Sequence, residues 1–394
     1  MIENILLTDA NYKNSLAILR SLKLDYEIDL LTQSSKLLTI CWYSRYKNSI
    51  IQIEEYENLR EYGNRILRIL EMKKYDYFIP VGLLSYVAAS MLKGLFLEKT
   101  NMLVPDWEMM EIAFNKSRTM EFGKELSIPI PWTIDIKNQE SIRDIPNYPI
   151  VLKVQDHDGS FVRYINNPKE LIQTVGNLKN SGRKNPIAQE YIKGTGYGFY
   201  AIYKNGKMFD FFMLKRIHEL PITGGPSTLA VSVKNKELFE AGKKITDKLN
   251  WTGPIMVEFK YDIRDQRFKL IEINPKLWGS LDFTIAAGIN VPKTIIGILN
   301  GEIDKPLSSH FEECRYDEAT YRWTFPYDFE FLMSDFKTAK LKEFVATSPD
   351  YSNTDLHDPL PTLFNIGMGL YGGARTLVDF DRRFPNGVIT RDAR

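Results

Sequence analysis

Two glutamates and an asparagine lie on neighbouring segments that alternate between the two faces of an expected β-hairpin. In residues 255–261 every odd-numbered residue is apolar, so Glu258 falls on the opposite face of the strand. In the next strand, Glu272 and Asn274 are two residues apart and share one face. A turn centred on Asp265 would bring Glu258 directly opposite Glu272, so that two like charges face each other.

Facing carboxylates repel unless a cation lies between them. Carboxylate and amide oxygens are hard ligands, which suit magnesium better than zinc. The sequence therefore predicts a magnesium site at Glu258, Glu272 and Asn274, and manganese would also fit it. The alternative is a pair of solvent-facing strand acids, which the hairpin alone would favour. Lys276 and the tight turn at 278–280 crowd the same strand, which is otherwise suited to burial, and this favours the metal site.

A single charge interrupts the apolar segment 150–154. Lys153 lies within it, where burial is costly without an anionic partner. A nucleotide phosphate would supply that partner, and the turn that follows contains Gly159 and Ser160, whose backbone amides could cover phosphate oxygens. The alternative is a lysine on an edge strand that extends its charged end into water. Taken alone, Lys153 supports both interpretations equally.

The first part of the chain alternates strand-like and helix-like segments. Strands are expected at 4–9, 28–32, 37–42 and 77–81. Their order predicts a small parallel sheet in an α/β domain over residues 1 to about 105. The first strand-to-helix turn, at 8–11, contains no glycine. A dinucleotide pyrophosphate needs glycine there for close backbone approach, so NAD binding is disfavoured.

The middle part of the chain reads as an α+β unit. The expected elements are a helix at 115–126, strands at 132–136, 150–155 and 187–191, a hairpin of 197–203 and 207–215 turning at Asn205 and Gly206, and a helix at 234–249 before the acidic hairpin. The last hundred residues are aromatic-rich and irregular, and the sequence assigns them no task.

Composition narrows the functional classes. The chain has 394 residues, which predicts about two to three domains. Its net charge of +1 disfavours a nucleic-acid partner. Cys41 and Cys314 are too few for a disulfide framework and lack the spacing of a zinc site. No secretory signal pattern and no membrane-length apolar stretch occurs, so we expect a cytoplasmic protein without a membrane partner. A P-loop motif is absent, which disfavours that class of ATPase.

From about residue 115 to residue 300 the chain resembles the ATP-grasp superfamily of carboxylate ligases. The order of the elements matches, and the preceding α/β part is similar to the glycine-poor N-terminal domain of these enzymes. The matching residues are Lys116 and Lys153 for the two nucleotide-binding lysines, Gln189, Glu190, Tyr191 and Ile192 for the hinge that holds adenine, and Glu258, Glu272 and Asn274 for the metal ligands.

This resemblance implies a combination of α/β and α+β folds, with a glycine-poor Rossmann-like N-terminal domain followed by a two-lobed ATP-grasp fold with antiparallel sheets. We expect the N-terminal domain at 1–105 and a small lobe with Lys153 at 106–186. A large lobe with the metal site would follow at 187–305, and a C-terminal region of unassigned role at 306–394.

The resemblance also implies ATP and Mg²⁺ as cofactors and a small-molecule carboxylate and an amine as substrates. The carboxylate would become an acyl phosphate, which the amine attacks to form an amide-type bond. Arg216 would reach the transferred phosphoryl group, and Lys276 would hold the acyl phosphate. Lys276 stands where biotin-carboxylase-like members carry arginine. Residues 194–198 are glycine, threonine or tyrosine where many relatives place a ribose-binding acid.

Other interpretations stay open at this level. An ATP-grasp kinase would release a phosphorylated small molecule, and a non-catalytic protein would bind nucleotide without turnover, although it would have no need of the three metal ligands. Arg216 could be a solvated strand end, and His218 is expected to be a loop histidine without a catalytic task. The loop 221–227 is either a cover for the site or a plain connector. A homodimer is compatible with the sequence.

Overall fold

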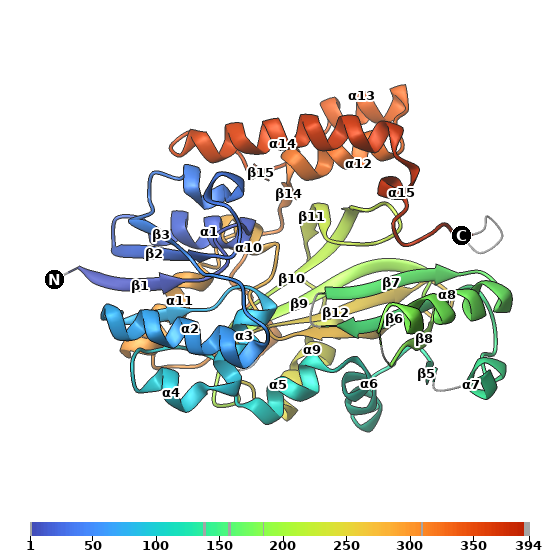
Figure 1. Ribbon diagram of the computed structural model, residues 1–394, viewed down its shortest axis with the longest axis horizontal. Coiled ribbons are helices and arrows are strands. Elements are labelled where there is room, and N and C mark those ends of the chain that lie inside the picture. The colour runs from blue at the N-terminus through green and yellow to red at the C-terminus, as the bar shows by residue number, and fades with distance from the viewer. Residues whose placement is uncertain (1, 137–138, 157–158, 184, 309, 390–394) are drawn as a thin grey trace.

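The computed structural model contains three β-sheets (Figure 1). It describes residues 2–136, 139–156, 159–183, 185–308 and 310–389. A four-stranded sheet near the N-terminus lies at one end of the molecule, and a second four-stranded sheet lies beside a seven-stranded sheet at the other end. The C-terminal helices run along one side of both parts. The combination of α/β and α+β folds expected from the sequence is confirmed.

The N-terminal sheet is parallel and has the strand order β3-β2-β1-β4. Its elements are β1 (Glu3–Leu7), α1 (Lys13–Leu22), β2 (Tyr26–Thr32), β3 (Ser49–Gln52), α2 (Leu59–Met72), β4 (Tyr77–Ile79), α3 (Leu83–Met91) and α4 (Lys93–Leu97). The turn after β1 has no glycine, and Asp9 takes the left-handed conformation there (φ 56°). The Asp9 carboxylate accepts hydrogen bonds from the Gly82 amide (2.8 Å) and the Ser85 hydroxyl (2.6 Å), which ties together the ends of two parallel strands.

The strand expected at 37–42 does not form. Two short 3₁₀ helices, η1 (Lys36–Leu38) and η2 (Ile40–Tyr43), take its place, and β3 pairs with β2 instead. Leu37 and Leu38 are exposed, whereas Cys41 is buried and its amide donates to the Ala10 carbonyl (3.2 Å). The prediction of a strand at 37–42 assumed that Leu37 and Leu38 are buried, whereas both are exposed.

The second sheet, here called the small-lobe sheet, has the order β5-β8-β6-β7. The elements of this part are α5 (Trp107–Phe114), α6 (Lys116–Glu125), β5 (Thr133–Asp135), α7 (Gln139–Arg143), β6 (Ile150–Asp156), β7 (Gly159–Ile165), α8 (Pro168–Asn180) and β8 (Ile187–Glu190). Its core is a separate cluster that includes Ile150, Leu152 and Ala188. β8 pairs with both β5 and β6, so it completes this sheet. The expected small lobe ended at residue 186, just before this strand.

The seven-stranded sheet has the order β13-β12-β9-β10-β11-β14-β15 and is antiparallel except between β14 and β15. Its strands are β9 (Gly194–Lys204), β10 (Lys207–Glu219), β11 (Ser227–Ser232), β12 (Gly253–Asp262), β13 (Arg267–Asn274), β14 (Thr320–Arg322) and β15 (Tyr351–Ser352). The helices α9 (Lys236–Lys248), α10 (Leu281–Ala286) and α11 (Val291–Asn300) belong to the same part. The expected turn between β9 and β10 is confirmed, with Asn205 and Gly206 both at positive φ (51° and 70°).

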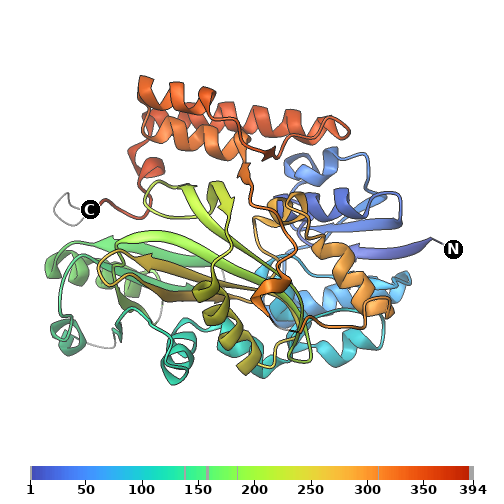
Figure 2. The ribbon, with the colours of Figure 1, turned by 180° about the vertical axis from the view of Figure 1, so that it is seen from behind.

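The last hundred residues join this sheet and then form helices along one side of the molecule (Figure 2). Their helical elements are η3 (Phe311–Glu313), η4 (Thr324–Asp328), α12 (Phe329–Ser334), α13 (Thr338–Ala346), α14 (Pro359–Val378) and α15 (Phe380–Arg383). Among the helices that the structure describes, none is both long enough and apolar enough to cross a bilayer.

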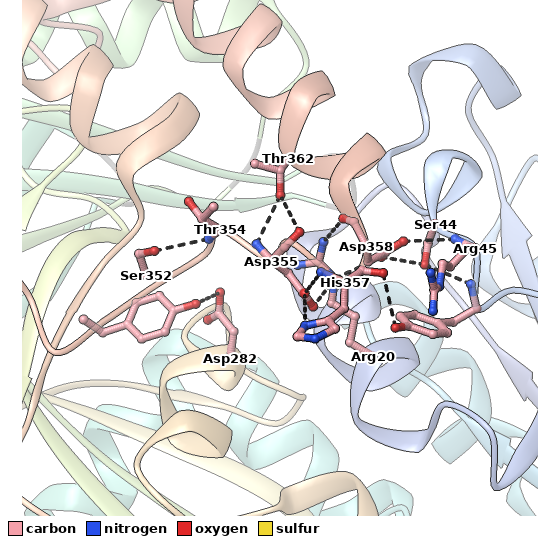
Figure 3. A network of polar contacts seen from close by, with 12 residues as sticks. Arg20, Ser44, Arg45, Asp282, Ser352, Thr354, Asp355, His357, Asp358 and Thr362 are labelled. Atoms are coloured by element: carbon pink, nitrogen blue, oxygen red, sulfur yellow. Dashed lines mark hydrogen bonds and ion pairs between the residues drawn. The ribbon is translucent and has the colours of Figure 1, made fainter.

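A buried aspartate fastens the start of α14 to the N-terminal domain (Figure 3). Asp358 is 1% exposed and accepts hydrogen bonds from Arg20 Nε (3.0 Å), the Ser44 hydroxyl (2.8 Å) and the Arg45 amide (3.0 Å). Arg20 Nη2 also donates to the Asp358 carbonyl (3.0 Å). A residue from the C-terminal region thus supplies the partner for an arginine that is itself largely buried.

Replacing Asp358 with alanine is expected to lower the free energy of unfolding by about 3 kcal/mol, because it leaves a buried arginine and two other donors without their acceptor. Asp355, 3.5 Å from Arg20 Nε, would offset part of the loss. Urea unfolding followed by tryptophan fluorescence measures the change. Asp304→Ala, at an exposed position, is the control and should leave the midpoint unchanged; an equal shift in both variants would contradict the role of Asp358.

Candidate active site

The acidic hairpin brings its two glutamates face to face. Glu258 on β12 pairs directly with Glu272 on β13, as the alternation predicts. The turn is one residue shorter than a uniform hairpin centred on Asp265 would have, since Asp262 pairs with Arg267. A β-bulge beside Glu258 restores the pairing of the two glutamates. Bulges of this kind re-aim side chains, and here the result is a convergent pair of carboxylates.

The side chain of Asn274 lies between the two carboxylates. Its amide nitrogen donates to Glu258 Oε1 (3.0 Å) and to Glu272 Oε1 (2.9 Å). One positively polarised group therefore already holds both carboxylates at a common point. Rotation of the amide by half a turn would present its oxygen there, which gives three hard oxygen ligands of the kind that magnesium prefers.

This set of ligands suits a metal that is also bound by phosphate. Within the described ranges, no group of three or more Asp, Glu, His or Cys side chains could hold a metal ion by itself. Magnesium is commonly bound through one or two carboxylates together with substrate phosphates. Glu258, Glu272 and Asn274 fit that mode of binding.

Two cationic side chains form ion pairs with the carboxylate pair. Lys116, the first residue of α6, places Nζ 3.5 Å from Glu272 Oε2. Arg216 on β10 places Nη2 2.6 Å from Glu258 Oε2 and also pairs with Glu219 (3.1 Å). The expected position of Arg216, just after a strand, is corrected: it lies inside β10, next to a bulge. The paired strands and one helix start thus carry charges of both signs at one point.

These charges move the two glutamates in opposite directions. Burial raises the pKa of Glu258, Arg216 opposes this rise, and the charge of Glu272 adds to it. Burial also raises the pKa of Glu272, but Lys116 and Lys153 outweigh burial and hold that pKa below its usual value. Glu272 is therefore the carboxylate that keeps its charge most strongly, and Glu258 depends on a neighbouring cation.

Lys153 is buried with a neutral partner. Its side chain is 7% exposed, and Nζ donates to Gln189 Oε1 on the adjacent strand β8 (2.7 Å). The amide nitrogen of Gln189 donates to Thr133 Oγ1 (3.1 Å), which fixes the orientation of that amide. Burial lowers the pKa of Lys153 to about 8, with Glu272 acting in the opposite direction. The hydrogen-bond partner of Lys153 is thus a neutral amide rather than the expected anion. The buried ammonium would be stabilised by an anionic ligand such as a phosphate.

Residues 189–192, the expected adenine hinge, line the cavity described below and form an ion pair. The Glu190 carboxylate lies 2.7 Å from Arg264 Nη2, and the Glu190 backbone amide donates to the Trp132 carbonyl (2.9 Å). The Tyr191 ring packs edge-on against Tyr164, with ring centroids 5.7 Å apart. The Glu190 side chain therefore contacts the turn of the β12–β13 hairpin. Its expected role in holding adenine stays a prediction.

A cavity of about 180 Å³ lies between the small-lobe sheet and the seven-stranded sheet. Among its lining residues are Lys116, Lys153, Gln189, Glu190, Tyr191, Ile192, Arg216, Glu258 and Glu272, all of which were singled out from the sequence. Lys260 and Tyr164 line it too and were missed. The alternation that placed Glu258 also puts Lys260 on its face, so a signal for that lysine was present.

A second cavity, of about 340 Å³, shares Arg216, Glu258 and Glu272 with the first. Asn274, Lys276 and the 278–280 turn line it, and so does Lys13 from the N-terminal helix α1. Lys13 Nζ lies 4.2 Å from the centroid of a Trp323 ring. Burial lowers the pKa of Lys13 to about 8, while Asp282 acts in the opposite direction. No local pattern marks Lys13, because the fold alone brings it here.

The loop after β10 borders both cavities. Gly225 lines each of them, and its carbonyl accepts a hydrogen bond from Arg216 Nη1 (3.1 Å). The Tyr164 hydroxyl of the small lobe donates to the Thr223 carbonyl. The loop thus contacts both β7 and β10 beside the two cavities, and its role as a cover or a plain connector stays a prediction.

Two further predictions concern residues beside the site. His218 is not in a loop: it lies in β10, where Nδ1 is 2.9 Å from Asp328 Oδ1 and the ring stacks on Phe331. It lines neither of the two cavities. Gly159 and Ser160 begin β7, opposite the end of β6. The side chain of Ser160 lies outside the described part of the chain, as do residues 157–158.

A family profile described as "ATP-grasp in the biosynthetic pathway with Ter operon" matches residues 185–321. This segment contains residues 189–192 and the strands β9 to β13, and therefore the acidic hairpin. The profile match and the likenesses that follow confirm the resemblance seen in the sequence.

The chain is similar to a curated relative and to solved structures. A D-aspartate ligase from Enterococcus faecium is 22% identical over 214 residues, which cover 48% of this chain and half of the relative's length. A biotin carboxylase complex with βγ-ATP from Campylobacter jejuni has a TM-score of 0.64 at 17% identity, over 81% of this chain and 75% of the other. An L-amino acid ligase from Bacillus licheniformis has a TM-score of 0.59 at 14% identity, over 81% and 78%.

Proposed function

We propose that this chain, which has the ATP-grasp fold, is an ATP- and magnesium-dependent ligase that activates a small-molecule carboxylate as an acyl phosphate and transfers it to an amine. One observation carries the proposal. Two cavities meet at the Glu258 and Glu272 carboxylates. Lys116 and Lys153 line the first cavity, and Lys13, Arg216 and Lys276 line the second. A phosphoryl donor in the first cavity and a carboxylate in the second would come together at that junction.

The first cavity has the side chains needed to hold a triphosphate. Lys116 and Lys153 approach from the small-lobe side and would bind phosphate oxygens as charge-assisted donors. Magnesium held by Glu258, Glu272 and Asn274 would neutralise charge on the terminal phosphates. Arg216, which lines both cavities, would stabilise the negative charge that develops on the transferred phosphoryl group.

The reaction follows from this arrangement. A carboxylate oxygen would attack the γ phosphorus, and the bond to the bridging oxygen would break with its electron pair leaving on ADP. The amine nitrogen would then attack the carbonyl carbon and lose one proton, while phosphate departs with the electrons of the carbon–oxygen bond. Lys276 lies in the second cavity, where it would bind the acyl phosphate before the amine attacks.

The second cavity suits an anionic substrate with an apolar portion. Lys13, Arg216 and Lys276 provide positive charge, and Tyr200 and Trp278 provide aromatic wall. The names of the similar D-aspartate ligase and L-amino acid ligase support an amino acid as one of the two substrates. We therefore infer that the carboxylate or the amine comes from an amino acid or a similar small dipolar molecule.

Replacing Lys13 with methionine is expected to raise KM for the carboxylate substrate roughly 10-fold to 100-fold, because a charged donor to a carboxylate contributes about 1.5–3 kcal/mol. The nucleotide Kd should stay unchanged, since Lys13 lines only the second cavity of the two. Steady-state kinetics and nucleotide titration measure the two effects. Lys23→Met, at the end of the same helix, is the matched control. Equal weakening of nucleotide binding would show that Lys13 acts on the fold instead.

A substrate-library assay tests the proposed function. The purified protein is given ATP, magnesium and pairs of amino acids, small carboxylates and amines, and ADP and phosphate are measured. The proposal expects release only when the right carboxylate and amine are both present, and a product whose mass is that of the two substrates less water. A product that keeps the phosphoryl group would indicate the kinase alternative. Nucleotide binding without turnover over the whole library would indicate the non-catalytic one.

A further inference from the structure

The longest helix of the chain exposes an apolar face. α14 runs along one side of the molecule, and in both views its outer side faces away from the sheets (Figures 1 and 2). From residue 359 to residue 374 it carries no charged side chain. A surface helix ordinarily turns polar residues outward, so an apolar outer face calls for a reason.

Six of the exposed residues of α14 follow a regular spacing. They form a stripe, here called the α14 stripe, that consists of Leu360, Leu363, Gly367, Leu370, Ala374 and Leu377. Met368, Tyr371 and Val378 are also exposed and widen the apolar face beside the stripe. Successive members are separated by three and four residues in turn, which is the spacing of the a and d positions in paired helices. The four leucines are 56%, 60%, 55% and 47% exposed. The spacing indicates that a second helix would lie along the stripe.

The inner face of α14 is already packed, so the stripe cannot turn inward. Gly369, Gly372, Gly373 and Thr376 are buried on that side. A methyl group added to Gly369 would lie 2.7 Å from Phe325, and one added to Gly373 would lie 2.7 Å from Phe329. These close approaches, together with the Asp358 hydrogen bonds, hold the helix in one orientation and present the stripe outward.

Gly367 supplies a separate observation. It sits in the middle of a 20-residue helix, it is exposed, and a methyl group added to it would meet nothing within 4 Å. Glycine at an exposed helical position costs about 1 kcal/mol relative to alanine. Nothing within the described chain uses the space that this glycine leaves. A large side chain from another helix would fill it.

We propose that the α14 stripe binds the same stripe of a second copy of this chain, with the two helices antiparallel about a two-fold axis. In that register Leu360 meets Leu377 of the partner subunit, Leu363 meets Ala374 of the partner subunit, and Gly367 meets Leu370 of the partner subunit. Both small residues then face leucines. A parallel pair would instead set glycine against glycine and alanine against alanine, which leaves voids.

The composition of α14 favours a protein partner over a lipid surface. Helices that lie on membranes combine an apolar face with a polar face rich in lysine and arginine. The face opposite the α14 stripe is buried against the protein, and Arg375 is the one charged residue in the whole helix. Leucine layers at heptad spacing suit helix pairing.

Cysteine cross-linking tests both the partner and the orientation. Leu360→Cys and Leu377→Cys are prepared as single variants of the full chain and oxidised separately and as a mixture. Antiparallel pairing predicts a cross-linked dimer in the mixture at least tenfold more abundant than in either variant alone. Cross-linking of each variant with itself would overturn the antiparallel arrangement. The unsubstituted chain, with Cys41 and Cys314, gives the background.

A second measurement covers the case in which cysteine disturbs the stripe. Leu370→Glu places a charge at the centre of the pair and is expected to raise the dimer Kd at least tenfold in sedimentation equilibrium, whereas Arg375→Gln, off the stripe, should not change it. A monomeric unsubstituted chain at all concentrations would overturn the proposal. So would a monomer that sediments with phosphatidylserine-containing vesicles, which would assign the stripe to lipid.

Discussion

Replacing Glu272 with alanine is expected to lower kcat/KM for ADP release by about 10³-fold, the upper end of what removing one charge-stabilising group from a reacting site costs. Glu272 is the carboxylate whose pKa Lys116 and Lys153 hold down against burial, so it keeps its charge throughout the neutral range. Its loss would remove a metal ligand and leave two cations without their shared anion. Coupled measurement of ADP release at saturating magnesium gives the result.

Two variants separate this effect from damage to the fold. Glu302→Ala removes an exposed glutamate outside both cavities and should retain full activity. Glu272→Gln keeps the size and the polar atoms of the side chain but not the charge, and should be nearly as inactive as the alanine variant. Turnover that survives in both Glu272 variants would reject the carboxylate pair as the metal site, whatever their melting temperatures.

The acidic hairpin was predictable because strand periodicity is local. Once 255–261 and 270–274 are identified as strands, alternation alone fixes which side chains share a face, and the pairing of Glu258 with Glu272 follows from the turn. The bulge was not predictable, because a bulge is set by packing of neighbouring strands rather than by the hairpin sequence. Here the bulge and the shorter turn compensate, which is why the expected pairing is nevertheless found.

Residues that enter the site from far along the chain escaped prediction. Lys13 is separated from Lys276 by most of the chain, and only docking of α1 against the C-terminal half brings both to one cavity. The Asn14 side chain donates to the Leu277 carbonyl (3.2 Å) at the same junction. Local periodicity predicts neither arrangement, because the residues involved are far apart in the sequence.

The C-terminal helices were unassigned for a different physical reason. Sequence patterns identify a helix by apolar residues that point toward a core. In α14 the leucines point outward and glycines line the buried face, so the usual pattern is inverted. The expected strand at 37–42 failed in a related way, because its leucines are exposed in short 3₁₀ turns. Both cases show that an apolar run predicts burial only when the fold supplies a surface to cover it.

The nucleotide affinity of the protein is expected to fall as the pH rises above about 8. A lysine ordinarily titrates near pH 10.4, but burial lowers the pKa of Lys153 to about 8 in the nucleotide-free protein. Below that pH the ammonium is charged and can bind phosphate; above it, the amine must first take up a proton, which weakens binding by up to tenfold for each pH unit. Calorimetric titration with ADP and magnesium from about pH 7 to about pH 9.5 measures the slope.

Lys153→Met isolates the share of this lysine. The variant is expected to bind nucleotide roughly 10-fold to 100-fold more weakly at pH 7, by the loss of a charged hydrogen bond, and to show a flatter dependence above pH 8. Lys260 lines the same cavity and burial lowers its pKa as well, so the residual slope of the variant reports on that second lysine. Identical slopes in the variant and the unsubstituted protein would mean that the Lys153 ammonium does not face the phosphates, because a group that binds them must transmit its own titration to their affinity.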